Sequence, residues 1–253
     1  MNNPITFLGA GPGDPELITL KGRRLLDEAD LVVFAGSLVN PALLDGIRAE
    51  IFDSAGMNLD EIITVMVQGY RDGKKVVRLH TGDPAIYGAI REQMALLDGK
   101  NIPYDVIPGV SSALASAAAL KVELTVPEVT QTVIFTRQAG RTPVPEAESL
   151  RRLAAIGGSM CIFLSVSMIE KVVAELITGG YPAETPIAVV EKATWPDQHI
   201  VRGTLADIAE KIEKSAIRKT AMILVGRALA DTSNAVSRLY DAGFSHEYRR
   251  KKE

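Results

Sequence analysis

The chain is poor in the residues that crosslink a protein, bind metals or stack on bases. Its 253 residues include one cysteine and three histidines, and aromatic residues make up only 5%. A single cysteine excludes an intramolecular disulfide framework, and Cys161 lies in an apolar run, which predicts a buried strand position. The histidines His80, His199 and His246 lie far apart and have no cysteine or histidine at metal-ligand spacing. We therefore expect no metal bound by the protein.

Long apolar segments and a strong charge of one sign are also missing. No run of about 18 apolar residues occurs, and residues 1–15 lack the basic start and apolar stretch of a signal peptide. We expect no membrane span and a cytoplasmic location. The formal net charge of −3, with few aromatic residues, argues against a nucleic-acid partner. The basic run at 249–252 is interpreted as a solvated tail, with a nucleic-acid or anionic-lipid patch as the alternative.

Apolar β-branched runs alternate with helical patterns along almost the whole chain. This alternation predicts an α/β N-terminal domain with a mainly parallel sheet. The aperiodic segment 121–128 marks a boundary, which gives an N-terminal domain of residues 1–122 and a C-terminal domain of residues 123–253. In the first domain we expect strands at 5–8, 31–34, 51–52, 75–79 and 104–107, and helices at 17–29, 41–49, 59–71, 84–97 and 111–120.

The second half has a different order of elements. Only residues 192–198 separate two of its strands, which favours an antiparallel hairpin and therefore a mixed sheet. The fold class is thus two α/β domains, the first with a mainly parallel sheet and the second with a mixed one. In the second domain we expect strands at 132–136, 159–164, 187–191, 199–203 and 221–225, and helices at 146–155, 168–178 and 205–217.

The turn after the first strand, residues 9–15 (GAGPGDP), contains three glycines within five residues. It is not a dinucleotide-binding fingerprint, because Asp14 stands where the third glycine is required and Pro12 has no amide to donate. The glycines still allow a ligand to approach the backbone closely. A tight turn with a purely structural role is the alternative.

Two further turns follow strands in the same way. In residues 81–88 (TGDPAIYG), Asp83 and Pro84 are expected to be the N-cap and first residue of a helix, and residues 108–112 (PGVSS) add two hydroxyl groups. Because parallel strands end at one edge of a sheet, the three turns would form one rim, where such sheets bind small ligands. The residues alone thus predict an α/β protein with a small-molecule site. They do not indicate which residue would act as a catalytic nucleophile or base.

In this order, the three turns resemble those of the tetrapyrrole methylases, the S-adenosylmethionine-dependent enzymes of cobalamin and sirohaem synthesis. The run 191–194 (EKAT) also matches, and the resemblance extends over residues 5–227. Members that act on uroporphyrinogen usually carry Lys-Gly-Gly-Asp-Pro where this chain has HTGDP at 80–84, which indicates another branch. Residues 34–41 (FAGSLVNP), 193–197 (ATWPD) and the tail at 237–249 resemble the branch that methylates carbon 11 of precorrin-4 to give precorrin-5.

The resemblance implies two α/β domains with the active site between them, S-adenosylmethionine as cofactor, S-adenosylhomocysteine as product, and a homodimer. It names no catalytic residue and no metal bound by the protein. Carried over position by position, the implied cofactor contacts are Pro12, Thr81, Gly82, Asp83, Ile86, Ser111, Ser112, Leu164 and Ala193.

The implied substrate is a tetrapyrrole with several carboxylates, which arginine recognises well through paired hydrogen bonds. Arg137 and Arg141, in the loop 137–145, are candidate contacts if this loop closes over the substrate, and a solvated surface loop is the alternative. His199 is a further candidate.

Other functions remain open at this stage. Within the family, these are a cobalt-precorrin-4 methylase of the anaerobic route or another tetrapyrrole methylase. A nicotinamide-dependent oxidoreductase is disfavoured by Pro12 and Asp14. A non-enzymatic module that senses S-adenosylmethionine or a nucleotide is the third possibility.

Overall fold

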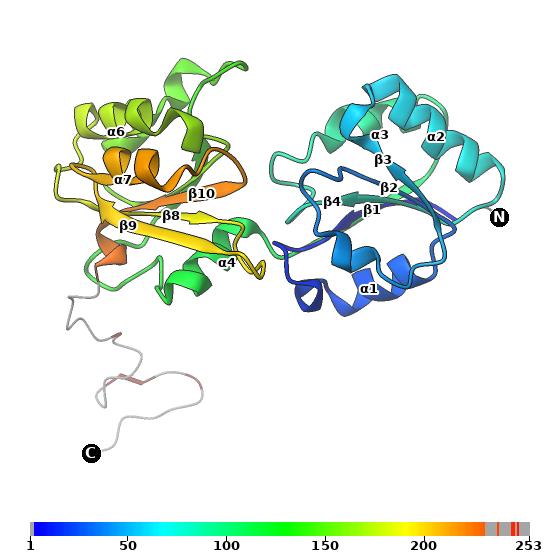
Figure 1. Ribbon diagram of the computed structural model, residues 1–253, viewed down its shortest axis with the longest axis horizontal. Coiled ribbons are helices and arrows are strands. Elements are labelled where there is room, and N and C mark those ends of the chain that lie inside the picture. Colours follow the sequence, from blue (N-terminus) through cyan, green and yellow to red (C-terminus); the bar gives the residue numbers. More distant parts are fainter. Residues whose placement is uncertain (1–2, 231–236, 238–243, 246, 248–253) are drawn as a thin grey trace. The chain divides into compact units, whose positions relative to one another are not determined.

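The computed structural model describes residues 3–230, 237, 244, 245 and 247. The chain divides into two compact units, each with a five-stranded sheet (Figure 1). Unit 1 comprises Met1–Ala115 and Lys192–Gln198, and unit 2 comprises Ser116–Glu191 and His199–Glu253. The basic run 249–252, His246 and most of the tail motif at 237–249 lie outside the described residues.

The sheet of unit 1 is wholly parallel, as the alternating pattern predicts. Its strands lie in the order β3-β2-β4-β1-β5. Their bounds are β1 Ile5–Gly9, β2 Leu31–Phe34, β3 Glu50–Asp53, β4 Val76–His80 and β5 Tyr104–Ile107.

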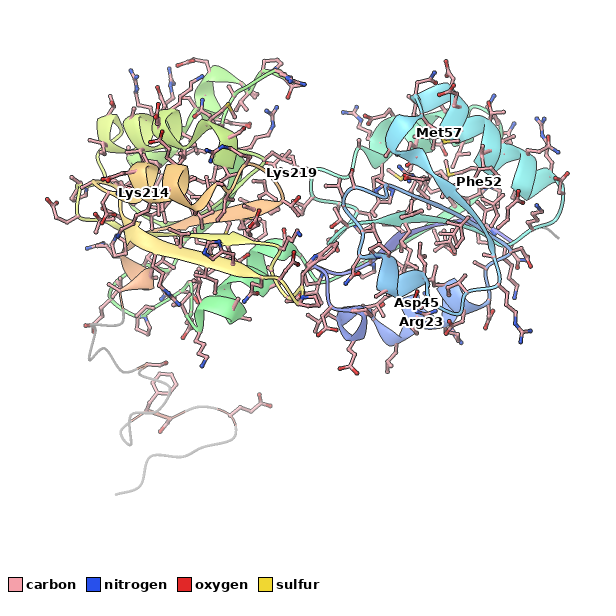
Figure 2. All side chains as sticks on the ribbon, in the orientation of Figure 1. Arg23, Asp45, Phe52, Met57, Lys214 and Lys219 are labelled. Atoms are coloured by element: carbon pink, nitrogen blue, oxygen red, sulfur yellow. The ribbon has the colours of Figure 1, made fainter. Side chains whose placement is uncertain are left out.

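Helices cover both faces of this sheet. On one face, α2 (Leu59–Arg71) and α3 (Ile90–Asp98) pack on a core that Phe52 and Met57 flank (Figure 2). On the other face lie α1 (Leu20–Asp27) and the short 3₁₀ helices η1 (Pro15–Leu17) and η2 (Pro41–Leu44). The helix α4 (Ser112–Leu120) follows β5, and η3 (Ser54–Gly56) follows β3.

The connections that follow the central strands β1 and β4 run toward opposite edges of the sheet. From β1 the chain passes through α1 on one face to β2, and from β4 it passes through α3 on the other face to β5. Open α/β sheets bind ligands at the carboxyl ends of strands where the connections diverge in this way. The first and second glycine turns follow β1 and β4, so both lie at this point of the sheet.

The expected helix at 84–97 is wrong in its first part. The helix α3 begins only at Ile90, because Tyr87 (φ 54°) and Ala89 (φ 50°) adopt the left-handed conformation. Asp83 is therefore not the N-cap of this helix. The expected helix 41–49 is also shortened, to η2. By contrast, α2 has the expected bounds, and its capping box is formed by Asn58 and Glu61, whose side chains each accept from the other's amide at 3.1 and 2.7 Å.

The sheet of unit 2 is mixed, as predicted. Its order is β6-β7-β10-β8-β9; β6 and β7 are parallel, and β8 and β9 form the expected antiparallel hairpin. The strands are β6 Val133–Arg137, β7 Ser159–Phe163, β8 Pro186–Glu191, β9 His199–Thr204 and β10 Ala221–Val225. The helices are α5 Leu150–Ala154, α6 Ile169–Thr178 and α7 Ile208–Ser215, with 3₁₀ helices η4 Glu146–Glu148, η5 Val166–Met168 and η6 Arg227–Leu229.

The single cysteine occupies the predicted position. Cys161 lies in β7 with no exposed surface, and burial raises the pKa of its thiol to about 12. Such a thiol packs as a small apolar side chain and is not a nucleophile. Within the described part of the chain, no helix has the length and apolar character that crossing a bilayer requires.

Candidate functional site

Backbone hydrogen bonds join the first two glycine turns. The amide of Gly82 donates to the carbonyl of Gly11 at 2.8 Å, and the amide of Gly11 donates to the carbonyl of Gly82 at 3.3 Å. Both glycines have positive φ values, +78° at Gly11 and +61° at Gly82, which side chains disfavour. The two turns therefore form one paired surface beyond the ends of β1 and β4.

The carboxylate of Asp83 joins the second turn to the third. Its Oδ1 accepts from the amide of Ala85 at 2.8 Å, and its Oδ2 accepts from the amide of Gly109 at 3.0 Å. Asp83 thus holds together two turns that are 26 residues apart. The predicted N-cap role is replaced by this tertiary one.

Glycines at the rim let the three turns approach each other. A Cβ on Gly9 would lie 2.6 Å from the Cα of Gly109 and 2.7 Å from the carbonyl oxygen of Gly82, all of them backbone atoms. No side chain fits there, so close packing of the backbone accounts for glycine at position 9. By contrast, a Cβ on Gly82 would meet nothing nearer than 3.7 Å, the amide nitrogen of Ser112.

Two other segments hold the first turn. The side-chain amide of Asn40 donates to the carbonyl of Gly13 at 2.8 Å, and the indole Nε1 of Trp195 donates to the carbonyl of Pro12 at 3.1 Å. The amide of Asp14 donates to Oγ1 of Thr194 at 2.9 Å. No local pattern predicts these roles, although Asn40, Thr194 and Trp195 lie in two of the motifs that carry the resemblance.

Several donors on the rim have no partner among the described residues: the amide of Gly13, and the amide and hydroxyl of Ser112. The hydroxyl of Ser111 accepts from the amide of Ala113 at 3.3 Å and so caps the start of α4. None of the three turns carries a lysine or arginine. Unpaired backbone and hydroxyl donors can bind the acceptor groups of a small polar ligand, and the turns carry no basic side chain that would repel a cationic group of that ligand.

A buried cation lies on β4, close to the second turn. Arg78 donates to the carbonyl of Val33 at 3.2 Å, to Oγ of Ser54 at 3.0 Å and to Oε1 of Gln93 at 3.3 Å. Burial lowers its pKa to about 10. Arg78 thereby connects β2, η3 and α3 to β4, below the edge that carries the turns. This role is not predictable from the sequence, since a lone arginine in an apolar strand gives no local signal.

The last residue of β4, His80, is neutral. Burial, and to a smaller extent the charge of Arg78, lower its pKa to about 3. Its Nε2 is buried and has no partner among the described residues. His80 stacks near Phe7, with ring centroids 6.0 Å apart, and so packs as an uncharged aromatic ring.

The structure brings together the predicted cofactor contacts that lie in unit 1. These are Pro12, Thr81, Gly82, Asp83, Ile86, Ser111 and Ser112, on the three turns at neighbouring strand ends. Ala193 also belongs to unit 1; it is buried, next to Thr194, which accepts from the first turn. The four other predicted site residues, Leu164, Arg137, Arg141 and His199, lie in unit 2.

In unit 2, Leu164 directly follows β7 in the left-handed conformation (φ 54°), which is uncommon for a residue other than glycine, and it is 69% exposed. His199 is exposed at the start of β9, opposite Glu191 in the hairpin.

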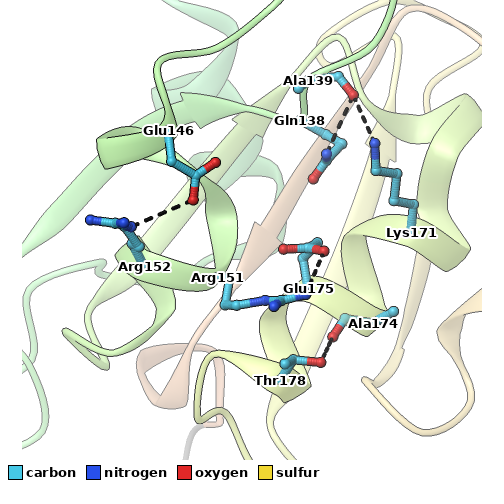
Figure 3. Close-up of polar contacts among 9 residues, drawn as sticks. All are labelled: Gln138, Ala139, Glu146, Arg151, Arg152, Lys171, Ala174, Glu175 and Thr178. Carbon is cyan, nitrogen blue, oxygen red and sulfur yellow. Dashed lines mark hydrogen bonds and ion pairs between the residues drawn. The ribbon is translucent and has the colours of Figure 1, made fainter.

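The loop after β6 is braced from within and by α6. Arg137 donates to the carbonyls of Thr142 at 3.1 Å and Pro143 at 2.6 Å. Lys171 on α6 donates to the carbonyl of Ala139 at 3.3 Å (Figure 3). Arg141 is exposed and has no partner among the described residues. Of the two arginines predicted to contact the substrate, Arg137 thus forms hydrogen bonds within the loop, whereas Arg141 is exposed and unpaired among the described residues.

Within the described part of the chain, no three His, Cys, Asp or Glu side chains are grouped closely enough to hold a metal ion.

Comparison with known proteins identifies what the chain resembles. Residues 4–209 match the family model described as Tetrapyrrole (Corrin/Porphyrin) Methylases. A cobalt-precorrin-4 C(11)-methyltransferase of Methanocaldococcus jannaschii is 60% identical over 98% of this chain and 97% of that protein. A precorrin-4 C(11)-methyltransferase of Pseudomonas aeruginosa is 48% identical over 97% of this chain and 98% of that protein.

Solved structures give the same result for the fold. The X-ray structure of a cobalt-precorrin-4 methyltransferase, a cobalamin biosynthetic enzyme, matches with a TM-score of 0.87 at 50% identity, over 89% of this chain and 95% of that one. A uroporphyrin-III C-methyltransferase from Thermus thermophilus, in complex with S-adenosylhomocysteine, matches with a TM-score of 0.77 at 28% identity, over 90% of this chain and 99% of that one.

Proposed function

This chain belongs to the tetrapyrrole methylase family, and we propose that it transfers a methyl group from S-adenosylmethionine to carbon 11 of precorrin-4. The observation that carries the proposal is the 60% identity, over nearly both full lengths, to an enzyme named for this reaction. The precorrin-4 branch that motifs 34–41 and 193–197 resemble is the branch of that relative. Its name specifies the cobalt-bearing substrate, which we therefore favour over the metal-free one.

The rim of unit 1 fits the cofactor chemically. Its unpaired donors, the amide of Gly13 and the amide and hydroxyl of Ser112, can bind the polar groups of a nucleoside and an amino acid. The absence of basic residues from the three turns is compatible with a sulfonium cation, and Pro12 and Asp14 break the glycine fingerprint that binds the pyrophosphate of a nicotinamide cofactor. We propose Pro12, Thr81, Gly82, Asp83, Ile86, Ser111, Ser112, Leu164 and Ala193 as its contacts.

In this reaction the protein binds S-adenosylmethionine and the tetrapyrrole and orients them toward each other. S-adenosylmethionine supplies a methyl group that is already activated by the sulfonium, so no covalent nucleophile or protein metal is required. A ring carbon of the substrate bonds to the methyl carbon in line as the methyl–sulfur bond breaks and S-adenosylhomocysteine leaves. Such a displacement needs the reacting atoms held about 3–3.5 Å apart and aligned. A rim made rigid by paired backbone and by Asp83 is suited to that task.

The substrate's carboxylates need cationic partners. We propose Arg141 as such a contact, because its guanidinium is exposed and unpaired among the described residues. Arg137 supports the loop by donating to two of its carbonyls, and Arg137 and His199 remain candidate contacts. From the family resemblance alone, we also propose that the protein is a homodimer and is cytoplasmic. Light scattering of the purified protein measures its molar mass and so tests the homodimer.

Labelled methyl transfer tests the reaction. The protein is incubated with methyl-¹³C S-adenosylmethionine and either cobalt-precorrin-4 or metal-free precorrin-4, and NMR locates the new methyl. We expect the label on carbon 11, with faster turnover of the cobalt substrate. A label on another carbon contradicts the proposed position but not the family, and faster turnover of the metal-free substrate contradicts the preference for cobalt.

Calorimetry separates this proposal from the other classes of function. We expect S-adenosylhomocysteine to bind and NAD to show no heat of binding. Binding without transfer to any tetrapyrrole would instead indicate a sensor module.

A further inference from the structure

The segment Lys192–Gln198, here termed the latch, is bonded to both residues that flank Gly13. It connects β8 to β9 along the chain, yet its contacts group it with unit 1. The indole of Trp195 donates to the carbonyl of Pro12 at 3.1 Å, and Thr194 accepts from the amide of Asp14 at 2.9 Å. The latch therefore fixes the chain on each side of Gly13.

Gly13 and Trp195 form a matched pair. A Cβ on Gly13 would overlap the indole ring, with its Cγ only 2.9 Å away. The φ of Gly13 is not positive, so its backbone conformation does not require glycine. The packing of Trp195 does require it, because any side chain at position 13 would push the ring away.

The latch has a strained conformation that its own contacts maintain. Lys192 (φ 47°) and Thr194 (φ 71°) are both left-handed, which is particularly unfavourable for a β-branched residue. The amide of Thr194 donates to Oε1 of Gln198 at 2.8 Å, and Lys192 forms an ion pair with Asp197. The ammonium of Lys192 also lies 5.7 Å from the centroid of the Trp195 ring. Backbone strain of this kind persists only where surrounding contacts fix the conformation, and it is concentrated at functional sites.

A segment other than the latch also holds the turn, which leaves one polar group of Gly13 unpaired among the described residues. Asn40 donates to the carbonyl of Gly13 at 2.8 Å, whereas the amide of Gly13 has no partner among the described residues. With Pro12, Gly13 and Asp14 each bonded to another segment, the direction of that amide is set.

We propose that the latch positions the first glycine turn for the cofactor, with Trp195 and Thr194 as positioning residues that orient the amide of Gly13. This inference rests on the proposed function, because it takes S-adenosylmethionine as the ligand. The inference assigns a role in cofactor binding to Trp195 and Thr194, which contact the turn and affect the ligand only through it. The latch is thus part of cofactor binding rather than a hairpin connection alone.

Single substitutions in the latch test the proposal in the full chain. Thr194→Val removes the acceptor of the Asp14 amide, and Trp195→Phe keeps an aromatic ring but removes the indole donor. Each change is expected to raise the dissociation constant of S-adenosylhomocysteine about fivefold in calorimetry, since each loses one hydrogen bond that orients the turn. In turnover, KM for S-adenosylmethionine rises while KM for the tetrapyrrole stays at the wild-type value.

Two control variants distinguish positioning from general loss of structure. Thr194→Ser keeps the hydroxyl and is expected to restore wild-type affinity. Glu210→Gln breaks an exposed ion pair with Lys214 on α7, outside the latch and the turns, so its affinity should stay within about twofold of wild type. Amide hydrogen exchange at Asp14 should be faster in Thr194→Val and unchanged in Thr194→Ser.

The chain's single tryptophan makes the latch directly observable. Fluorescence emission therefore comes from Trp195 in its contact with the turn. Without ligand, we expect the emission of Thr194→Val to differ from wild type and that of Thr194→Ser to equal it. Emission of Thr194→Val equal to that of wild type contradicts the role of Thr194 in holding the turn against Trp195.

The outcomes separate this proposal from the function on which it rests. If the wild-type protein binds S-adenosylhomocysteine and Thr194→Val and Trp195→Phe bind it equally well, the positioning role is wrong and the function stands. If the wild-type protein does not bind S-adenosylhomocysteine, the proposed function fails and the role of the latch fails with it.

Discussion

Replacing Gly9 with alanine tests whether the three turns form one tightly packed rim. The new methyl would lie 2.6 Å from Cα and N of Gly109 and 2.7 Å from the carbonyl oxygen of Gly82. Carbon atoms make favourable contacts at about 3.5–4.0 Å, so the turns after β4 and β5 would have to move by roughly 1 Å. Overpacking of this kind costs about 1–3 kcal/mol, and we expect the upper end because all three atoms belong to backbone.

The matched control is Gly56→Ala in η3. A Cβ on Gly56 meets nothing within 4 Å, and its φ is not positive. This substitution should leave the free energy of unfolding unchanged or raise it by about 0.4–1 kcal/mol, through the entropy of the unfolded chain.

Urea unfolding and ligand titration measure the two effects. Trp195 is the only tryptophan and belongs to unit 1, so its emission follows the unfolding of that unit. For Gly9→Ala we expect a free energy of unfolding about 3 kcal/mol below wild type and a dissociation constant for S-adenosylhomocysteine at least about tenfold higher, a loss of about 1.4 kcal/mol. Stability and affinity equal to those of Gly56→Ala would refute the packed rim.

Three further predictions concern buried polar groups. Because the pKa of His80 is lowered to about 3 in the folded chain, the unfolded chain binds more protons between that value and pH about 6.5. The free energy of unfolding should therefore fall as pH drops through this window, by up to about 1.4 kcal/mol per unit, and His80→Gln should show a smaller slope in urea titrations; equal slopes contradict the shift. Arg78→Lys should lower the free energy of unfolding by about 1–3 kcal/mol, because an ammonium does not reproduce the bonds to Ser54 and Gln93, and an unchanged urea midpoint would show that they contribute nothing. The thiol of Cys161, with its pKa raised to about 12, should react with a thiol reagent at pH 8 only after unfolding, and rapid labelling of the native protein would disprove its burial.

Local patterns in the sequence predict the elements whose causes are local. The capping box of Asn58 and Glu61 and the apolar face of α2 lie within one segment, and the bounds of that helix are as expected. The start of α3 is not predictable in this way. The Asp83-Pro84 pair is typical of a helix start, but the second oxygen of Asp83 binds Gly109, 26 residues away, and two left-handed residues delay the helix.

The same distinction between local and distant causes applies to the candidate site. Glycines and hydroxyl residues at strand ends locate the rim, since the carboxyl ends of parallel strands must lie together. The reasons for particular residues depend on partners far along the chain. Gly13 packs against Trp195, and the carbonyl of Pro12 accepts from that residue across 183 positions. Arg78 similarly acquires its role only when β2, η3 and α3 surround it.

Amide hydrogen exchange with and without saturating S-adenosylhomocysteine tests the central claim most directly. The claim is that the cofactor binds the rim formed by the turns at 9–15, 81–88 and 108–112. We predict that the ligand slows exchange at the amides of Gly13 and Ser112, which have no partner among the described residues. Unchanged exchange at both amides, with protection elsewhere in the chain, would contradict the placement of the site.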